Sequence, residues 1–155
     1  MNKSTSFFSV GNPLYGDDGV GKAVLDTLKA LPEYKNATFF DAGTDALSLI
    51  DHFSKDGQNI IVDAAKMGKS PGSVVAISPK DAKLIIQWDH LSIHGFGLAE
   101  TFQMAEKIGS LPKKVIIIGI EPEEIKIDKG LSETVVNAIP KAINLIKREV
   151  NINGS

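Results

Sequence analysis

Residues 7–28 read FFSVGNPLYGDDGVGKAVLDTL: a short apolar run, a glycine-rich loop and a segment with apolar residues at helical spacing. This order predicts a strand, a loop at its carboxyl end and a helix, which is the building unit of α/β proteins. Such a loop often cradles phosphate. Here it carries the adjacent acids Asp17 and Asp18, and carboxylates repel phosphate. We therefore expect these acids either to cap the helix or to face a positive group such as a metal ion.

The composition is that of one ordinary globular domain. The chain has 155 residues and a net charge of −2, and we expect a single domain over residues 1–155. There are no cysteines, which excludes disulfides, thiolate ligands and a cysteine nucleophile, and fits a cytoplasmic protein. Nothing indicates a basic nucleic-acid footprint, and no apolar run is long enough to predict a membrane helix or a signal peptide.

Short segments rich in valine, isoleucine and phenylalanine alternate with segments of helical period. Strands are predicted over residues 5–10, 37–41, 59–63, 73–78 and 114–120. Helices are predicted over residues 17–31, 44–54, 94–108 and 131–149. Pro140 predicts a kink or a break in the last helix.

This alternation predicts a three-layer α/β domain with a mainly parallel sheet. The apolar runs at 60–62 and 115–118 are continuous, which is typical of strands covered on both faces. Residues 73–78 follow the preceding strand too closely for a helical crossover. An antiparallel pairing of that strand, which would make the sheet mixed, is therefore open.

Carboxylates follow three successive predicted strands. Asp18 comes after the first, Asp41 ends the second and Asp63 ends the third. Ligands of open parallel sheets bind outside the carboxyl ends of the strands. His94 begins a predicted helix after a long loop and can reach the same edge. Two carboxylates and one imidazole suit a divalent transition metal and leave positions open for water or for a group carried by a partner.

Each of these residues also has an ordinary structural interpretation. Asp17 or Asp18 would serve as a helix N-cap, and of the two we expect Asp17 to be the cap. Asp41 would organise the following turn through its side chain. His94 alone would more often be a residue at a helix start than a ligand. Asp63 is harder to explain in this way, since an unpaired buried carboxylate is costly.

A nucleotide-binding loop is the competing interpretation of the glycine-rich segment. Residues 16–23, GDDGVGKA, nearly match the pattern G-x-x-x-x-G-K-[ST]. They depart from it at Ala23, where the pattern needs a hydroxyl that holds magnesium. We therefore rank nucleotide binding below metal recognition.

With these motifs the chain resembles the hydrogenase maturation endopeptidases, which remove a C-terminal tail from the large-subunit precursor of nickel-iron hydrogenases. The likeness lies in residues 11–21, 41–44, 62–64, 92–98 and 119–132. In the second block Ala42 replaces a glycine of the family. The resemblance implies an α/β/α sandwich with a mixed five-stranded sheet and aspartyl-type endopeptidase activity. A groove at the strand ends would suit a monomer that grips the larger precursor. From the composition we expect a cytoplasmic protein with no nucleic-acid or membrane partner.

The resemblance also implies roles for the acids. Asp18, Asp63 and His94 would recognise nickel that arrives with the precursor and is not a permanent cofactor. Many family members carry glutamate where this chain has Asp18. Asp41 matches another important acid, and activation of water by Asp41 or by nickel stays open.

The glycine-rich loop would let the incoming tail approach the backbone closely. Its substrate-facing residues are then Gly11, Asn12, Gly16 and Gly19. The alternative function is a non-catalytic metal-binding escort or chaperone of hydrogenase assembly.

Overall fold

The computed structural model describes residues 4–89 and 97–154. Its strands are β1 (Thr5–Val10), β2 (Thr38–Asp41), β3 (Gln58–Lys66), β4 (Val74–Ile77), β5 (Trp88–Asp89) and β6 (Val115–Ile120). Five of them form a sheet in the order β2-β1-β3-β6-β4, and β5 pairs with the end of β3. The first four in this order run parallel, whereas β4 runs antiparallel to β6. The sheet is therefore mixed and mostly parallel.

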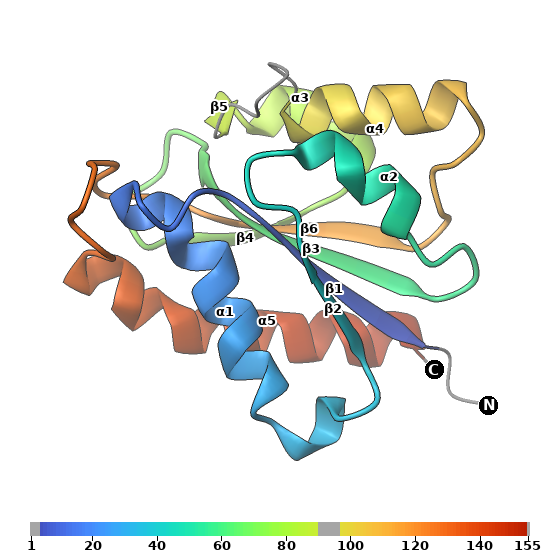
Figure 1. The fold of residues 1–155 in the computed structure, drawn as a ribbon, viewed down its shortest axis with the longest axis horizontal. Helices are drawn as coiled ribbons and strands as arrows, with labels where there is room; N and C mark the ends of the chain where they lie inside the picture. Colours follow the sequence, from blue (N-terminus) through green and yellow to red (C-terminus); the bar gives the residue numbers. More distant parts are fainter. Residues whose placement is uncertain (1–3, 90–96, 155) are drawn as a thin grey trace.

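Helices cover both faces of the sheet. They are α1 (Val20–Lys29), α2 (Leu49–His52), α3 (Ala82–Ile85), α4 (Leu98–Lys107) and α5 (Glu133–Gly154), with short 3-10 turns η1 (Gly16–Gly19), η2 (Pro32–Tyr34), η3 (Ala46–Ser48) and η4 (Pro79–Asp81). Figure 1 shows α1 and α5 on one side of the sheet and α2, α3 and α4 on the other. This is the three-layer α/β/α architecture that the sequence predicts. No helix in the described part of the chain has both the length and the apolar character needed to cross a membrane.

Each face of the sheet has its own hydrophobic core, because successive side chains of a strand point to opposite faces. Phe7 is buried on the α1–α5 face and packs edge-on against Tyr34, with ring centroids 5.1 Å apart. Phe8 is buried on the opposite face and packs against Phe53 at 5.6 Å. The central strand β3 is buried from Gln58 to Ala65, which explains its continuous apolar run.

Several predicted elements differ from the observed ones. The predicted helix over 44–54 is a 3-10 turn followed by the four-residue α2, and the strand over 59–63 continues to Lys66. The elements β5 and α3 were not predicted. The helix α5 continues through Pro140 without the predicted break. Both Pro140 and Val136 are exposed, so water can satisfy the Val136 carbonyl that the proline leaves without an amide donor.

Candidate functional site at the carboxyl ends of the strands

Asp63 lies within β3 and not at its end. The strand continues because β5 pairs antiparallel with its last residues, with Ala65 opposite Asp89. Asp63 is fully buried, and the parallel register places it beside Val10 of β1. Because side chains alternate along a strand, Asp63 shares the face of Ile61 and Ala65, which belong to the core beneath α2, α3 and α4.

Asp18 lies in the 3-10 turn η1, at the end of the loop that follows β1. Its side chain is buried, and its Oδ2 accepts a hydrogen bond from the Asn12 backbone N–H at 2.8 Å. Gly11 adopts a φ of +133°, and a Cβ atom there would lie 2.0 Å from the carbonyl oxygen of Asp18. A glycine is therefore required at position 11 for the loop to bring Asp18 back against its own beginning.

Asp17 is not the helix cap that we expected. The N-cap of α1 is Gly19, and no side chain caps this helix. The fully buried Asp17 carboxylate instead accepts four hydrogen bonds from the segment after β6. The donors are the backbone N–H groups of Glu123 (2.9 Å), Glu124 (2.8 Å) and Ser132 (2.7 Å) and the Ser132 hydroxyl (2.9 Å). These partners are 106 to 115 residues away in sequence, so no local pattern could have predicted them.

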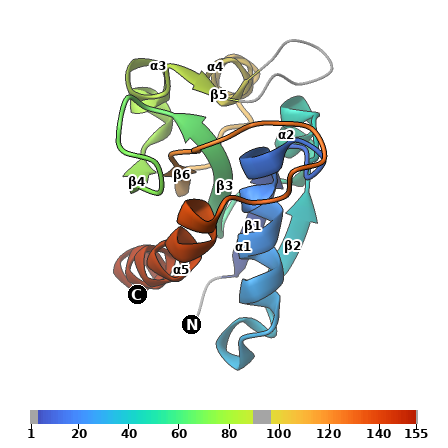
Figure 2. The same ribbon diagram turned by 90° about the vertical axis from the view of Figure 1, so that its left-hand side faces the viewer.

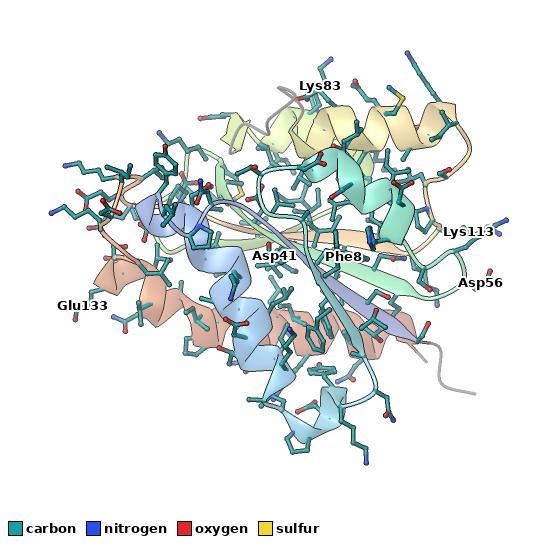
Figure 3. The ribbon with its side chains drawn as sticks, viewed as in Figure 1. Phe8, Asp41, Asp56, Lys83, Lys113 and Glu133 are labelled. Carbon is teal, nitrogen blue, oxygen red and sulfur yellow. The ribbon has the colours of Figure 1, made fainter. Side chains whose placement is uncertain are left out.

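Asp41 ends β2 and is exposed, at the position that Figure 3 labels. Its Oδ1 accepts hydrogen bonds from the Ser9 hydroxyl at 3.0 Å and from the Gly43 backbone N–H at 2.9 Å. Asp41 therefore organises the turn after β2, which was one of its two predicted roles. Its register partner Ser9 lies beside Val62 on the other neighbouring strand, so Asp41 and Asp63 leave opposite faces of the sheet.

His94 lies outside the described residues, together with the rest of residues 90–96. The described chain that precedes residues 90–96 ends at Asp89. Asp89 pairs with Ala65, which is two residues after Asp63 on β3. The described chain resumes at Gly97, the N-cap of α4, whose N–H donates to Glu100 Oε1 at 3.0 Å. Among the described residues alone, no group of three or more histidines and acids is arranged to hold a metal ion.

Several amide groups of the glycine-rich loop already have hydrogen-bond partners within the protein. The N–H groups of Gly11, Asp17 and Asp18 donate to the carbonyl oxygens of Gly43, Glu124 and Tyr15, respectively. The N–H groups of Asn12 and Leu14 donate to side chains within the loop. Phosphate binding by this motif depends on free loop amides, so the geometry argues against a nucleotide site.

The predicted substrate-facing residues of the loop have internal partners as well. A Cβ atom at Gly16 would lie 2.7 Å from the Glu124 carbonyl oxygen, and one at Gly19 would lie 2.8 Å from Pro13 Cα. The side chain of Asn12 accepts a hydrogen bond from the Leu14 N–H at 2.9 Å. Close packing within the protein is therefore sufficient to explain these glycines, and their contact with a tail stays a prediction.

One buried acid, Glu121, was not singled out in the sequence analysis. Glu121 directly follows β6, and its Oε1 accepts hydrogen bonds from the backbone N–H groups of Met67 at 2.8 Å and Lys69 at 3.2 Å. It thereby ties the β3–β4 connection to the end of β6. The available signal was a glutamate immediately after a continuously apolar strand, where side chains are expected to be buried.

Comparisons with known proteins agree with this architecture. Residues 23–149 match the family model HycI, described as hydrogenase maturation protease. The hydrogenase expression/formation protein HoxM of Cupriavidus necator is 28% identical over 145 residues, which are 90% of this chain and 72% of that protein. The hydrogenase 2 maturation protease of Escherichia coli is 27% identical over 149 residues, which are 94% of this chain and 89% of that protein.

The same class emerges from solved structures. The hydrogenase maturating endopeptidase HybD from E. coli superimposes with a TM-score of 0.81 at 25% identity, over 97% of this chain and 94% of that chain. The fold and its relatives define a peptidase of the hydrolase class. The chain belongs to the hydrogenase maturation protease family.

Proposed function

We propose that this peptidase removes the C-terminal extension of the large-subunit precursor of a nickel-iron hydrogenase, and does so only after nickel has been inserted. Family membership supports the reaction and the class of substrate. The observation that best supports metal recognition is that two buried carboxylates belong to neighbouring strands. Asp18 follows β1, and Asp63 lies within β3. Buried carboxylates are found with polar or charged partners, and a divalent metal ion is one partner that suits them in addition to hydrogen-bond donors.

In this proposal Asp18, Asp63 and His94 occupy open positions on nickel that the precursor already holds. Carboxylate and imidazole are common ligands of divalent transition metals. The nickel is part of the substrate, so the protease would need no resident metal. Ligation would test whether insertion is complete and would dock the scissile peptide bond at the strand ends.

Activation of the attacking water has two candidates. Nickel would polarise the peptide carbonyl or lower the pKa of a bound water. Asp41 would act as a general base. The Oδ1 atom of Asp41 accepts hydrogen bonds from Ser9 and Gly43, which hold the carboxylate in place. The residue is exposed, so a water molecule can reach it. Its position on the other face from Asp63 supports a role separate from metal recognition.

The proposal is tested by following tail removal from nickel-loaded precursor by mass spectrometry. We expect Asp18→Asn, Asp63→Asn and His94→Ala each to abolish cleavage while leaving the protease folded, because each removes one nickel ligand. Asp26→Asn is the matched control, since Asp26 is an exposed acid on α1 that pairs with Lys22. Complete processing by the triple variant would refute the assignment.

The same experiment separates the peptidase from a metal-binding escort. An escort would bind the precursor and leave its mass unchanged, whereas a peptidase shortens it with time. The cytoplasmic location and the monomeric state expected from the sequence stay predictions.

A further inference from the structure

We propose that Asp17 is a positioning residue that fixes the orientation of Asp18 by anchoring the glycine-rich loop to residues 121–132, here called the strap. The inference rests on the proposed role of Asp18 in nickel recognition. It concerns a residue that touches neither the precursor nor the metal and acts through its neighbour in the chain.

The strap and the loop lie side by side around residues 14–17 of the loop. Figure 2 shows the strap, in orange, running beside the blue loop at the start of α1. The Asp17 N–H donates to the Glu124 carbonyl oxygen at 2.9 Å, and the Asp128 N–H donates to the Leu14 carbonyl oxygen at 2.8 Å. Tyr15 forms an isolated antiparallel bridge with Ile127. The side chain of Asp17 adds four further hydrogen bonds between η1 and the strap.

The turn that carries Asp18 has little stiffness of its own. It spans four residues and has glycine at both ends, Gly16 and Gly19, and glycine allows the widest range of backbone angles. Its own backbone bonds are of the short 3-10 type: the Asp18 N–H donates to the Tyr15 carbonyl oxygen at 3.1 Å, and the Val20 N–H donates to the Asp17 carbonyl oxygen. The four bonds to the Asp17 side chain add an anchor outside the turn, which restricts the turn to one conformation.

The anchor requires a carboxylate and not merely a polar side chain. All four partners of Asp17 donate, three of them to Oδ2 and one, the Ser132 N–H, to Oδ1. Asparagine would place an NH₂ group against at least one of these N–H donors. Bonds to an ionised acceptor are also stronger than neutral ones. Asp17→Asn keeps the size of the side chain and weakens the anchor.

The Asn12 N–H reports on Asp18, because it donates to Asp18 Oδ2 and belongs to the other end of the loop. Amide hydrogen exchange of the protease alone, measured by NMR, is the test. We expect Asp17→Asn to accelerate exchange at Glu123, Glu124 and Ser132, and at Asn12 by about tenfold or more, which corresponds to about 1.4 kcal/mol. Accelerated strap exchange with unchanged exchange at Asn12 would overturn the proposal.

Asn59→Ala is the stability control. Asn59 is buried at the opposite end of β3, and its side chain donates to the carbonyl oxygens of Ser54 and Lys114. We expect this variant to lose stability without a selective change at Asn12. If Asp17→Asn does not fold, Ser132→Ala removes one of the four bonds and should accelerate exchange at Asn12 in the same direction by a smaller factor.

Cleavage of nickel-loaded precursor gives a second readout. We expect Asp17→Asn to lower kcat by about tenfold with little change in KM, because Asp18 is still present to ligate nickel but no longer aligns the scissile bond for reaction. An unchanged kcat alongside faster exchange at Asn12 would overturn the functional part of the proposal. If the wild-type protease leaves the precursor intact, the proposed function fails, whereas the exchange data still decide whether Asp17 holds Asp18.

Discussion

Asp17 and Asp18 are adjacent in the chain and leave the same 3-10 turn in different directions, because successive residues of such a turn are about 120° apart. Asp17 points to the strap, where four donors meet it. Asp18 points back to the start of the loop, where it meets the Asn12 N–H. The pair of acids in the sequence is therefore one structural anchor and one candidate ligand.

Asp41 combines a structural and a proposed catalytic role that two substitutions separate. Asp41→Asn retains an oxygen that accepts from Ser9 and Gly43, so the turn should persist, but an amide cannot take a proton from water. We expect this variant to fold normally and to lose cleavage by about 10²–10⁴-fold, the usual contribution of a general base. Kinetic assays with nickel-loaded precursor, together with a thermal melt, provide the measurement.

The comparison variant is Asp41→Ala, which removes the turn bonds as well. It should lose both stability and cleavage. Cleavage by Asp41→Asn at nearly the wild-type rate would assign water activation to nickel and leave Asp41 as an organiser of the turn.

Among the elements, those predicted well carry a local signal. The strand β1 coincides with the predicted residues 5–10, and β6 begins one residue later than predicted, because a short apolar run needs no distant information. The two-residue β5 and the four-residue α3 are too short to show a period. The length of β3 depends on β5, a partner that sequence periodicity does not reveal.

The candidate site also contains residues with a local sequence signal and residues whose role depends on tertiary contacts. Asp18 and Asp63 were chosen as candidates from their positions after strands. Both are buried, Asp18 in the turn that follows β1 and Asp63 within β3 and not at its end. The sequence placed Asp41 with them, but sheet alternation puts it on the other face. The role of Asp17 required tertiary contacts to the strap, which a single sequence does not contain.

The proline within α5 permits a prediction about that helix. Proline in a helix interior is about 3 kcal/mol less favourable than alanine, and here it deprives the Val136 carbonyl of an intrahelical donor. Since α5 is continuous and Pro140 is exposed, we expect Pro140→Ala to raise the free energy of unfolding by about 1–3 kcal/mol. Urea denaturation followed by circular dichroism measures this change.

Asn144→Ala serves as the reference on the same helix, because Asn144 is also exposed. Its gain should stay below about 0.7 kcal/mol, the range of ordinary helix propensities. A loss of stability in Pro140→Ala would show that the proline ring makes packing contacts that outweigh the missing hydrogen bond.

At the scale of the whole molecule, the proposed source of nickel makes the order of events testable. We expect protease treated with a chelator and desalted to cleave nickel-loaded precursor as fast as untreated protease, since the metal belongs to the substrate. Precursor prepared without nickel should stay uncut by either sample. Mass spectrometry of the four combinations gives the answer.

Two results would contradict this order. Loss of activity after chelation, restored by adding nickel to the protease, would make the metal a resident cofactor. Efficient cleavage of nickel-free precursor would show that the acids do not check for metal insertion.

The edges of the sheet restrict how such a protein can hold an extended peptide. Within the described residues, β2 pairs only with β1 and β4 only with β6, and each of these border strands is four residues long. Short borders offer few unpaired backbone groups, which discourages strand-to-strand aggregation and also leaves little room for a peptide to add as a further strand. An extended peptide would therefore gain few backbone hydrogen bonds by adding to the sheet as a further strand. We expect it to bind instead at the loops that follow the strand ends.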